Sequence, residues 1–275
     1  MKVSIITVTR NSEKYLSDCI ESVRRQNFKN IEHIVIDGKS TDGTLDIICK
    51  NSQNISGWIS ETDRGMYDAI NKGLKMATGD VVGILNSDDM FASADSVRSI
   101  VDCFETSDTD SVYGNLIYVD PVNTRKVVRY WKGISYKRSR FRYGWMPAHP
   151  TFYIRRELIE RYGLYENHYY TAADYEFMAR YLYVHKVSSQ YLDAILVKMR
   201  TGGISNESLK CRLRANRRDY LAMRRNHIPF SFVVSVLKPL RKLHQFHSSF
   251  AKQLSIENDE QSFLTTPLVY LPADG

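Results

Sequence analysis

Short apolar runs alternate with amphipathic stretches through the first 120 residues of the chain. Apolar runs between turn residues indicate buried strands, and apolar positions three and four apart indicate helices. The expected strands are Val3–Val8, Ile31–Asp37, Ile55–Ser60, Val81–Leu85 and Ser111–Val119, and the expected helices are Ser12–Gln26, Thr44–Asn51, Met66–Thr78 and Ala94–Glu105, the first capped by Asn11 or Ser12. This alternation predicts an α/β fold with a mostly parallel central sheet and helices on both faces.

The pattern changes after residue 120. The second half is expected to contain an extended stretch at Val127–Trp131, a basic loop at Lys132–Tyr143, a strand at Thr151–Ile154, a helix at Ala172–His185, a loop at Arg200–Gly203 and a basic helix at Glu207–Asn226. We therefore expect one domain over residues 1–205, with halves at 1–120 and 121–205. A basic helical extension at 206–247 and a loose tail at 248–275, which has no periodicity, would follow.

Composition places the chain among globular proteins. Its 275 residues are 43% hydrophobic and 25% charged. The N-terminus lacks a signal-peptide pattern, and no stretch approaches the roughly 20 apolar residues that span a bilayer. The four cysteines are far apart and lack metal-ligand spacing, so reduced thiols in a cytoplasmic protein are expected.

The charge differs between the two halves. Residues 1–120 carry 12 Lys+Arg and 19 Asp+Glu, whereas residues 121–275 carry 26 and 12. An acidic half beside a basic half predicts a metal-dependent site next to a surface that faces anions or a membrane. Nucleic acid is the usual alternative for a basic surface, but the chain shows no zinc finger, RNA-binding signature or helix-turn-helix pattern. We expect no nucleic-acid partner.

Two adjacent carboxylates, Asp88 and Asp89, follow the strand Val81–Leu85. Ligands of open parallel sheets bind beyond the carboxyl ends of the strands. Two acids there repel each other unless a cation lies between them, and hard oxygen ligands suit Mg²⁺ or Mn²⁺ with a diphosphate. The same pair also fits a surface turn or a helix N-cap.

Another carboxylate, Asp37, ends the second strand and precedes Gly38. It can accept hydrogen bonds from a ribose or a base, while the glycine permits close approach of a ligand. An Asp-Gly pair is also a common turn. Neither GxGxxG nor GxxxxGK[ST] is present, which argues against a dinucleotide-binding oxidoreductase and a P-loop NTPase.

Three stretches resemble, in their order and spacing, the inverting family 2 glycosyltransferases of the GT-A fold. This family includes enzymes that build bacterial surface polysaccharides of the colanic acid, capsule and O-antigen types. The stretches are Val3–Asn11, Ile36–Thr44 and Gly65–Asp89, and Ala172–Glu176 matches where the family places its catalytic base. The resemblance implies that residues 1–120 bind a nucleotide sugar, most simply a UDP-sugar, and that residues 121–205 bind the acceptor.

The resemblance also implies a role for each matching residue. Asp174 would be the catalytic base, Asp88 and Asp89 would bind the metal ion, and the donor would be bordered by Val8, Arg10, Asp37, Asp63, Arg64, Asp68 and Asp88. Two positions depart from the family's pattern. Asn86 stands where many relatives have Asp, which removes one charge from the metal site, and Ala173 stands where an acid often precedes the base.

Two further residues are candidates for contacts with the acceptor or the phosphates. His149 fits an acceptor contact or an ordinary wall residue, and Arg200 fits a diphosphate contact or a plain turn before a helix. Asp174 likewise fits an ordinary first-turn acid of a helix, which the macrodipole favours.

Residues 210–247 are strongly basic, with ten Lys+Arg, one acid and an apolar interruption at 230–237. Basic helices around an apolar wedge indicate an interfacial anchor on an anionic membrane. A solvated helix that packs on the domain is the alternative.

The sequence predicts an inverting glycosyltransferase that moves a sugar from a nucleotide donor to a growing, lipid-linked glycan in surface polysaccharide synthesis. It would use Mn²⁺ or Mg²⁺ and lie at the inner face of the plasma membrane. One alternative is a sugar-nucleotide nucleotidyltransferase, although the loop Thr9–Ser12 lacks the glycines such enzymes usually carry after the first strand. Another is a non-catalytic partner that binds a nucleotide sugar or a membrane.

Overall fold

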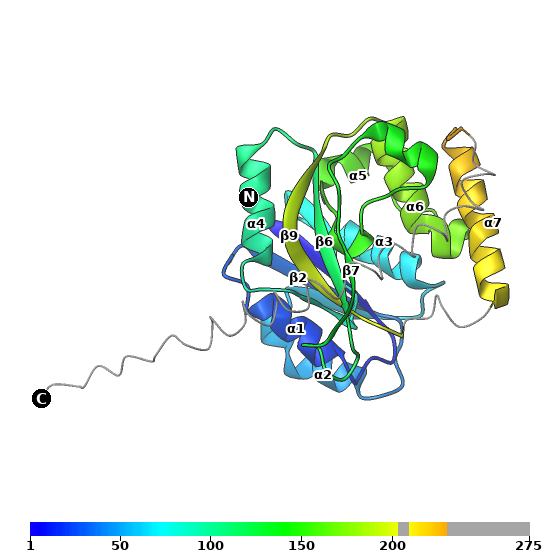
Figure 1. The fold of residues 1–275 in the computed structure, drawn as a ribbon. Coiled ribbons are helices and arrows are strands. Elements are labelled where there is room, and N and C mark those ends of the chain that lie inside the picture. The colour runs from blue at the N-terminus through cyan, green and yellow to red at the C-terminus, as the bar shows by residue number, and fades with distance from the viewer. Residues whose placement is uncertain (203–208, 230–275) are drawn as a thin grey trace, which may run out of the picture.

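A computed structural model describes residues 1–202 and 209–229. The described strands form one twisted sheet (Figure 1). Their order is β3-β2-β1-β4-β8-β6-β9-β5, with β7 paired to β6. The strands are β1 (Val3–Thr9), β2 (Ile31–Asp37), β3 (Gly57–Ser60), β4 (Val81–Ile84), β5 (Asp89–Phe91), β6 (Ser111–Val119), β7 (Val127–Trp131), β8 (Tyr153–Arg155) and β9 (Ser189–Arg200). Strands β1 to β4 pair in parallel, whereas the second half of the sheet is mixed.

Helices cover both faces of this sheet (Figure 1). The α-helices are α1 (Leu16–Arg24), α2 (Thr44–Lys50), α3 (Met66–Met76), α4 (Ser96–Thr106), α5 (Arg156–Tyr162), α6 (Ala173–Met178) and α7 (Leu209–Arg225). Short 3-10 or π segments are η1 (Ser52–Asn54), η2 (Arg138–Tyr143), η3 (His149–Thr151), η4 (Asn167–Ala172) and η5 (Ala179–Val184). The expected α/β class with helices on both faces is confirmed.

Alternation along the buried strands explains the two layers. In β1, Ile6 and Val8 pack in the cluster that contains α3 and α6, whereas Val3 and Ile5 pack with α1 and α4. Because both faces are covered, a strand here is apolar at nearly every position. Gly73 of α3 brings that helix close to the sheet, since a Cβ there would lie 2.4 Å from the Ile6 side chain.

Several expectations need correction. Helix α1 begins at Leu16 without a side-chain cap, because the Ser12 hydroxyl bonds that of Ser87 and Asn11 accepts the Thr41 amide. The expected helix at 172–185 divides into α6 and the π segment η5, and the expected strand at 151–154 begins only at Tyr153. Strand β9 ends at Arg200, where the sequence suggested only a loop.

The basic helix is present over the described residues as α7. It lies beside α6 and η4 (Figure 1), and its Ala222 and Met223 are buried in the core cluster. This stretch of the basic segment therefore packs on the domain. The apolar interruption at 230–237 and the expected tail at 248–275 lie outside the described residues.

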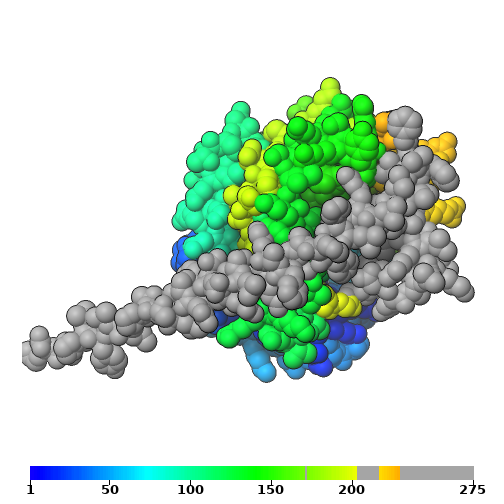
Figure 2. Space-filling view, viewed as in Figure 1, coloured from blue at the N-terminus to red at the C-terminus, as the bar shows by residue number. Residues whose placement is uncertain are grey.

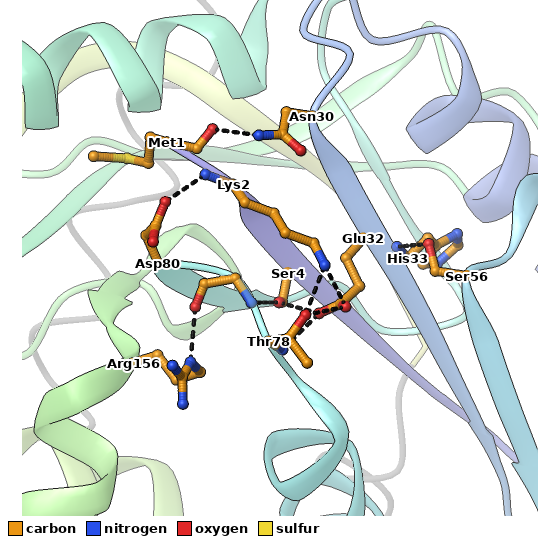
Figure 3. Close-up of polar contacts among 11 residues, drawn as sticks. Met1, Lys2, Ser4, Asn30, Glu32, His33, Ser56, Thr78, Asp80 and Arg156 are labelled. Carbon is orange, nitrogen blue, oxygen red and sulfur yellow. Dashed lines mark hydrogen bonds and ion pairs between the residues drawn. The ribbon is translucent and has the colours of Figure 1, made fainter.

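A polar network joins the amino ends of β1, β2 and β4 (Figure 3). The Glu32 carboxylate accepts hydrogen bonds from Lys2 Nζ, Ser4 Oγ and both the amide and the hydroxyl of Thr78. Burial alone would raise the pKa of Glu32, but these hydrogen bonds together outweigh it and lower the pKa to about 2. The network lies at the end of the strands opposite Asp37 and Asp88.

Replacing Glu32 by Gln is expected to lower the free energy of unfolding by about 1–3 kcal/mol, because Lys2, Ser4 and Thr78 lose a charged acceptor. Since the pKa of Glu32 is depressed on folding, its contribution is complete above about pH 4.5 and is lost as the pH falls toward 2. Urea unfolding from pH 7 to pH 3 measures both effects. The exposed Glu105→Gln is the control, and equal stability of the two variants would contradict the assignment.

Candidate active site

The carboxyl ends of β1, β2 and β3 meet at one edge of the sheet, where Thr9 pairs with Asp37 and Asp37 with Ser60. Asp37 is fully buried, and its two oxygens accept hydrogen bonds from the Ser40 amide and hydroxyl and from the Ser60 hydroxyl. These bonds hold the carboxylate in one orientation at the strand end.

Gly38, Arg10 and Asp63 converge beside Asp37. A Cβ at Gly38 would lie 2.7 Å from an Asp63 oxygen and 3.4 Å from the Arg10 side chain. Because it has no side chain, the buried Gly38 leaves room for a basic and an acidic side chain beside its backbone. Val8, in contrast, is buried in the core, so only its backbone borders this edge.

Asp88 and Asp89 follow β4 at the same edge but differ in exposure. Asp89 belongs to β5 and is fully buried, whereas Asp88 is half-buried in the preceding turn. Burial raises the pKa of both carboxyls, and the Asp88 charge raises that of Asp89 further. The nearby Arg200 charge lowers both pKa values, but by less than burial raises them.

Buried oxygens without partners lie at the same place. Asp89 Oδ1 and Asn86 Oδ1 have no hydrogen bond, while the Asn86 amide donates to Asp89 Oδ2 at 3.1 Å. Hard oxygen donors of this kind suit Mg²⁺ or Mn²⁺, and Mg²⁺ sites often use only one or two carboxylates together with substrate phosphates. Within residues 1–202 and 209–229, no cluster of three or more His, Cys, Asp or Glu could hold a metal ion. The residues present fit a cation shared with a diphosphate.

Arg200 reaches this turn from β9. Its guanidinium donates to the Asp88 carbonyl at 2.8 Å, forms an ion pair with Asp18 and lies 4.6 Å from the Tyr15 ring centroid. The side chain is only 4% exposed. In this arrangement Arg200 fixes the backbone that carries Asp88, and its expected contact with a diphosphate stays a prediction.

The loop before α3 and the first turn of α3 supply further acids. Asp63 accepts the Gly65 amide, and Asp68 accepts the Arg64 amide and the Asn167 side-chain amide. The hydrogen bond from the Arg64 amide is the main reason that the pKa of Asp68 is lowered. The Arg64 side chain itself is 87% exposed, so it is open to a ligand or to solvent.

The same helix, α3, also binds the second half of the domain. Asn71 both donates to the Tyr165 carbonyl and accepts the Tyr165 amide. The Tyr165 hydroxyl lies 2.8 Å from His149 Nε2, and burial lowers the pKa of His149 to about 4. His149 is therefore a neutral hydrogen-bonding group at pH 7.

Asp174, in the first turn of α6, is half-buried and joins this arrangement through Tyr67 of α3. Burial, then the Asp174 and Tyr165 charges, raise the pKa of Tyr67, while a hydrogen bond from the Asp174 backbone opposes the shift. The Tyr67 and Tyr165 rings are 5.5 Å apart. Neither tyrosine was predicted from the sequence, although the helical spacing of Tyr67 from Ile70 and Leu74 on α3 is a signal that could place it inward.

Comparison with known proteins identifies the family. The model of glycosyl transferase family 2 matches residues 4–163, which include Asp37, Asp63, Asp88 and His149. The chain belongs to glycosyl transferase family 2. A relative from Mycobacterium bovis, named "PGL/p-HBAD biosynthesis glycosyltransferase", is 31% identical over 208 residues, which is 74% of this chain and 78% of that protein.

Solved structures share the fold. TarS 1-349 from S. aureus matches with a TM-score of 0.62 and 21% identity over 98% of this chain and 76% of that one. A longer TarS structure is matched over only 44% of its length. The mannosyltransferase PcManGT from Pyrobaculum calidifontis, in complex with GDP-Man and Mn²⁺, matches with a TM-score of 0.62 and 17% identity over 97% of this chain and 76% of that one.

The family 2 chain is therefore a glycosyltransferase with the expected GT-A fold. Within the described residues, no helix combines the length and the apolar character that crossing a membrane requires. The roles of single site residues stay predictions.

Restoring the missing charge tests the cation site. Asn86→Asp is expected to tighten Mn²⁺ binding in the presence of UDP about tenfold, or about 1.4 kcal/mol. Two opposite unit charges about 4 Å apart near a protein surface attract each other by about 4 kcal/mol. The expected gain in binding free energy is smaller because the new carboxylate also repels Asp89. Calorimetric titration measures it, with exposed Asn54→Asp as the control. Weaker or unchanged binding in Asn86→Asp would contradict a cation at this turn.

Proposed function

We propose that the protein transfers a sugar, with inversion, from a UDP-sugar to a hydroxyl of a growing lipid-linked glycan in cell-surface polysaccharide synthesis. The main support is the arrangement of the acids. Asp37 and Asp88 follow β2 and β4 at one edge of the sheet, and Tyr67 of the neighbouring helix α3 hydrogen-bonds the backbone of Asp174. Structures of TarS with UDP and with UDP-GlcNAc support a nucleotide-sugar donor.

In this proposal residues 1–120 bind the donor. Asp37 contacts the base or ribose beside Val8 and Arg10, and the loop from Asp63 to Asp68 borders the ribose, diphosphate and sugar. When bound by Asp88 and Asp89, a divalent cation supplies positive charge to the diphosphate as it departs. The Mn²⁺ complex of PcManGT supports this assignment.

Residues 121–205 hold the acceptor in the proposed reaction. Asp174 takes the proton of the acceptor hydroxyl. At the same time the hydroxyl oxygen forms a bond to the anomeric carbon of the donor sugar, from the face opposite the diphosphate. The bond between that carbon and the phosphate oxygen breaks, and its electron pair leaves with UDP. One displacement inverts the anomeric configuration, and His149 donates or accepts a hydrogen bond near the acceptor.

A donor screen tests this function. The purified protein is incubated with Mn²⁺, each of several UDP-sugars and a prenyl-diphosphate-linked sugar, and released UDP is measured. Acceptor-dependent UDP release with at least one donor is expected. Conversion of a sugar phosphate and a nucleoside triphosphate into a sugar nucleotide would instead show a nucleotidyltransferase and overturn the proposal.

Residues 206–247 are proposed to bring the enzyme to the anionic inner face of the plasma membrane, where a lipid-linked acceptor resides. The seven Lys and Arg residues of α7, against one acid, support this placement. Flotation of the full chain with vesicles of phosphatidylcholine, with and without phosphatidylglycerol, tests it. Preferential flotation with the anionic vesicles is expected, and equal flotation with both would contradict it.

A further inference from the structure

A basic cleft lies between η4 and α7. It measures about 370 Å³ and is lined by His168, Arg217, Arg218 and Leu221. Helix α7, yellow to orange at the right of Figures 1 and 2, packs against η4 and α6. Three basic side chains and one apolar side chain thus converge on a cavity within the range of ligand pockets.

The basic groups are held by aromatic rings. The Arg218 guanidinium lies 4.3 Å from the Tyr170 ring centroid, and the His168 ring lies 4.1 Å from that of Tyr169. Stacking on a ring orients a guanidinium without neutralising its charge. Glu166 lies 3.4 Å from His168 Nε2 and restrains that imidazole. Tyr170 thus holds Arg218 at the cleft, which Arg217 also lines, and arginine matches phosphate geometry.

The cleft adjoins the reaction site. Helix α7 packs on α6, which carries Asp174, and on η4. Burial raises the pKa of Tyr67 and of Tyr175, and the charge of Asp219, which follows Arg218 on α7, adds to both shifts. Tyr67 also contacts the Asp174 backbone, so α7 and the proposed base approach the same tyrosine from different helices. On the other side, Asn167, next to His168, donates to Asp68 of the donor loop. An acceptor that presents a hydroxyl to Asp174 can extend from there toward Arg217 and Arg218.

We propose that this cleft binds the phosphate or diphosphate group of the acceptor. The inference rests on the proposed function and narrows it, because it limits the acceptor to phosphate-bearing glycolipids or glycans. Arg217 and Arg218 bind the phosphate oxygens, and Leu221, which is 41% exposed, contacts the adjoining apolar or sugar portion. The site is separate from the donor diphosphate at Asp88.

Binding of farnesyl diphosphate to the full chain tests the proposal. Saturating UDP and Mn²⁺ fill the donor site first, and calorimetry then measures the second ligand. Arg217→Gln combined with Arg218→Gln is expected to weaken farnesyl diphosphate about 10- to 100-fold, as loss of a charge-assisted hydrogen bond predicts. Arg224→Gln combined with Arg225→Gln removes the same charge from exposed positions of the same helix and is expected to leave the affinity unchanged.

Three outcomes would overturn the inference. The first is equal affinity in both double variants, and the second is farnesol binding as tightly as farnesyl diphosphate. The third is a preference for dihexanoyl phosphatidylglycerol, which would make the cleft a site for membrane headgroups. Because the assay requires no turnover, its result is independent of the UDP-release screen, so failure of the cleft and failure of the proposed function are distinguishable. Circular dichroism of each variant confirms that α7 remains folded.

Discussion

Asp174→Asn is expected to slow sugar transfer by about 10²- to 10⁴-fold, the usual contribution of a positioned general base. Asparagine keeps the shape of the side chain but cannot take the acceptor proton. The affinity for UDP with Mn²⁺ should stay within about twofold of the wild type, because the structure places Asp174 on α6 and the donor acids at the ends of β2 and β4. Single-turnover transfer and calorimetry measure the two quantities.

The control for this experiment is Asp46→Asn. Asp46 is an exposed acid in the first turn of α2, so it shares the helix position of Asp174 but lies away from the proposed acceptor site. Unchanged transfer is expected for Asp46→Asn. If Asp174→Asn is as active as that control, Asp174 is an ordinary first-turn acid and another group must take the proton.

Asp88→Asn is expected to weaken Mn²⁺-dependent UDP binding by about 10- to 100-fold or more. Loss of a residue that only supports a metal ligand already costs about 10- to 100-fold in metal affinity, and Asp88 is proposed to bind the metal itself. Asp88 is the more exposed of the two adjacent acids, and the Arg200 side chain fixes its carbonyl at 2.8 Å. Its carboxylate is therefore placed to reach a cation at the mouth of the site. UDP binding without metal should change little.

Exposed Asp108→Asn serves as the control for charge loss alone. Titrations of UDP at several Mn²⁺ concentrations separate metal affinity from nucleotide affinity. A variant of Asp88 that retains the wild-type dependence on Mn²⁺ would remove this residue from the cation site.

The donor half was predictable because its signals are local. Strands β2 and β6 have the expected bounds, and β1 and β4 differ from expectation by one residue, since each is an apolar run buried on both faces. Parallel pairing then brings the ends of β1, β2 and β4 to one edge. The placement of Asp37 and Asp88 at that edge follows from topology rather than from any contact between them.

The rest depends on contacts between residues far apart in the chain. Arg200 reads as part of a loop in the sequence, yet it ends β9 and binds Asp18, 182 positions earlier, because β9 crosses back to pair with β6 and β5. The π segment η5 likewise breaks a periodicity that suggested one continuous helix.

Tertiary packing also determines where the basic helix α7 lies. Seven basic residues on α7 suggest a solvated or membrane-facing helix, but Ala222 and Met223 bury one side of it against the acceptor half. This packing brings Asp219 near Tyr67 and Arg218 over Tyr170. No periodicity in the sequence indicates which helix α7 meets.

The edge formed by β1, β2 and β4 is proposed to bind a nucleoside diphosphate with a cation at Asp88. Anomalous diffraction from a crystal soaked with UDP and MnCl₂ tests this binding. We expect a manganese peak within coordination distance of the Asp88 carboxylate, with the UDP diphosphate beside it and the uridine next to Asp37 and Gly38. UDP bound at another surface, or manganese away from Asp88, would contradict it.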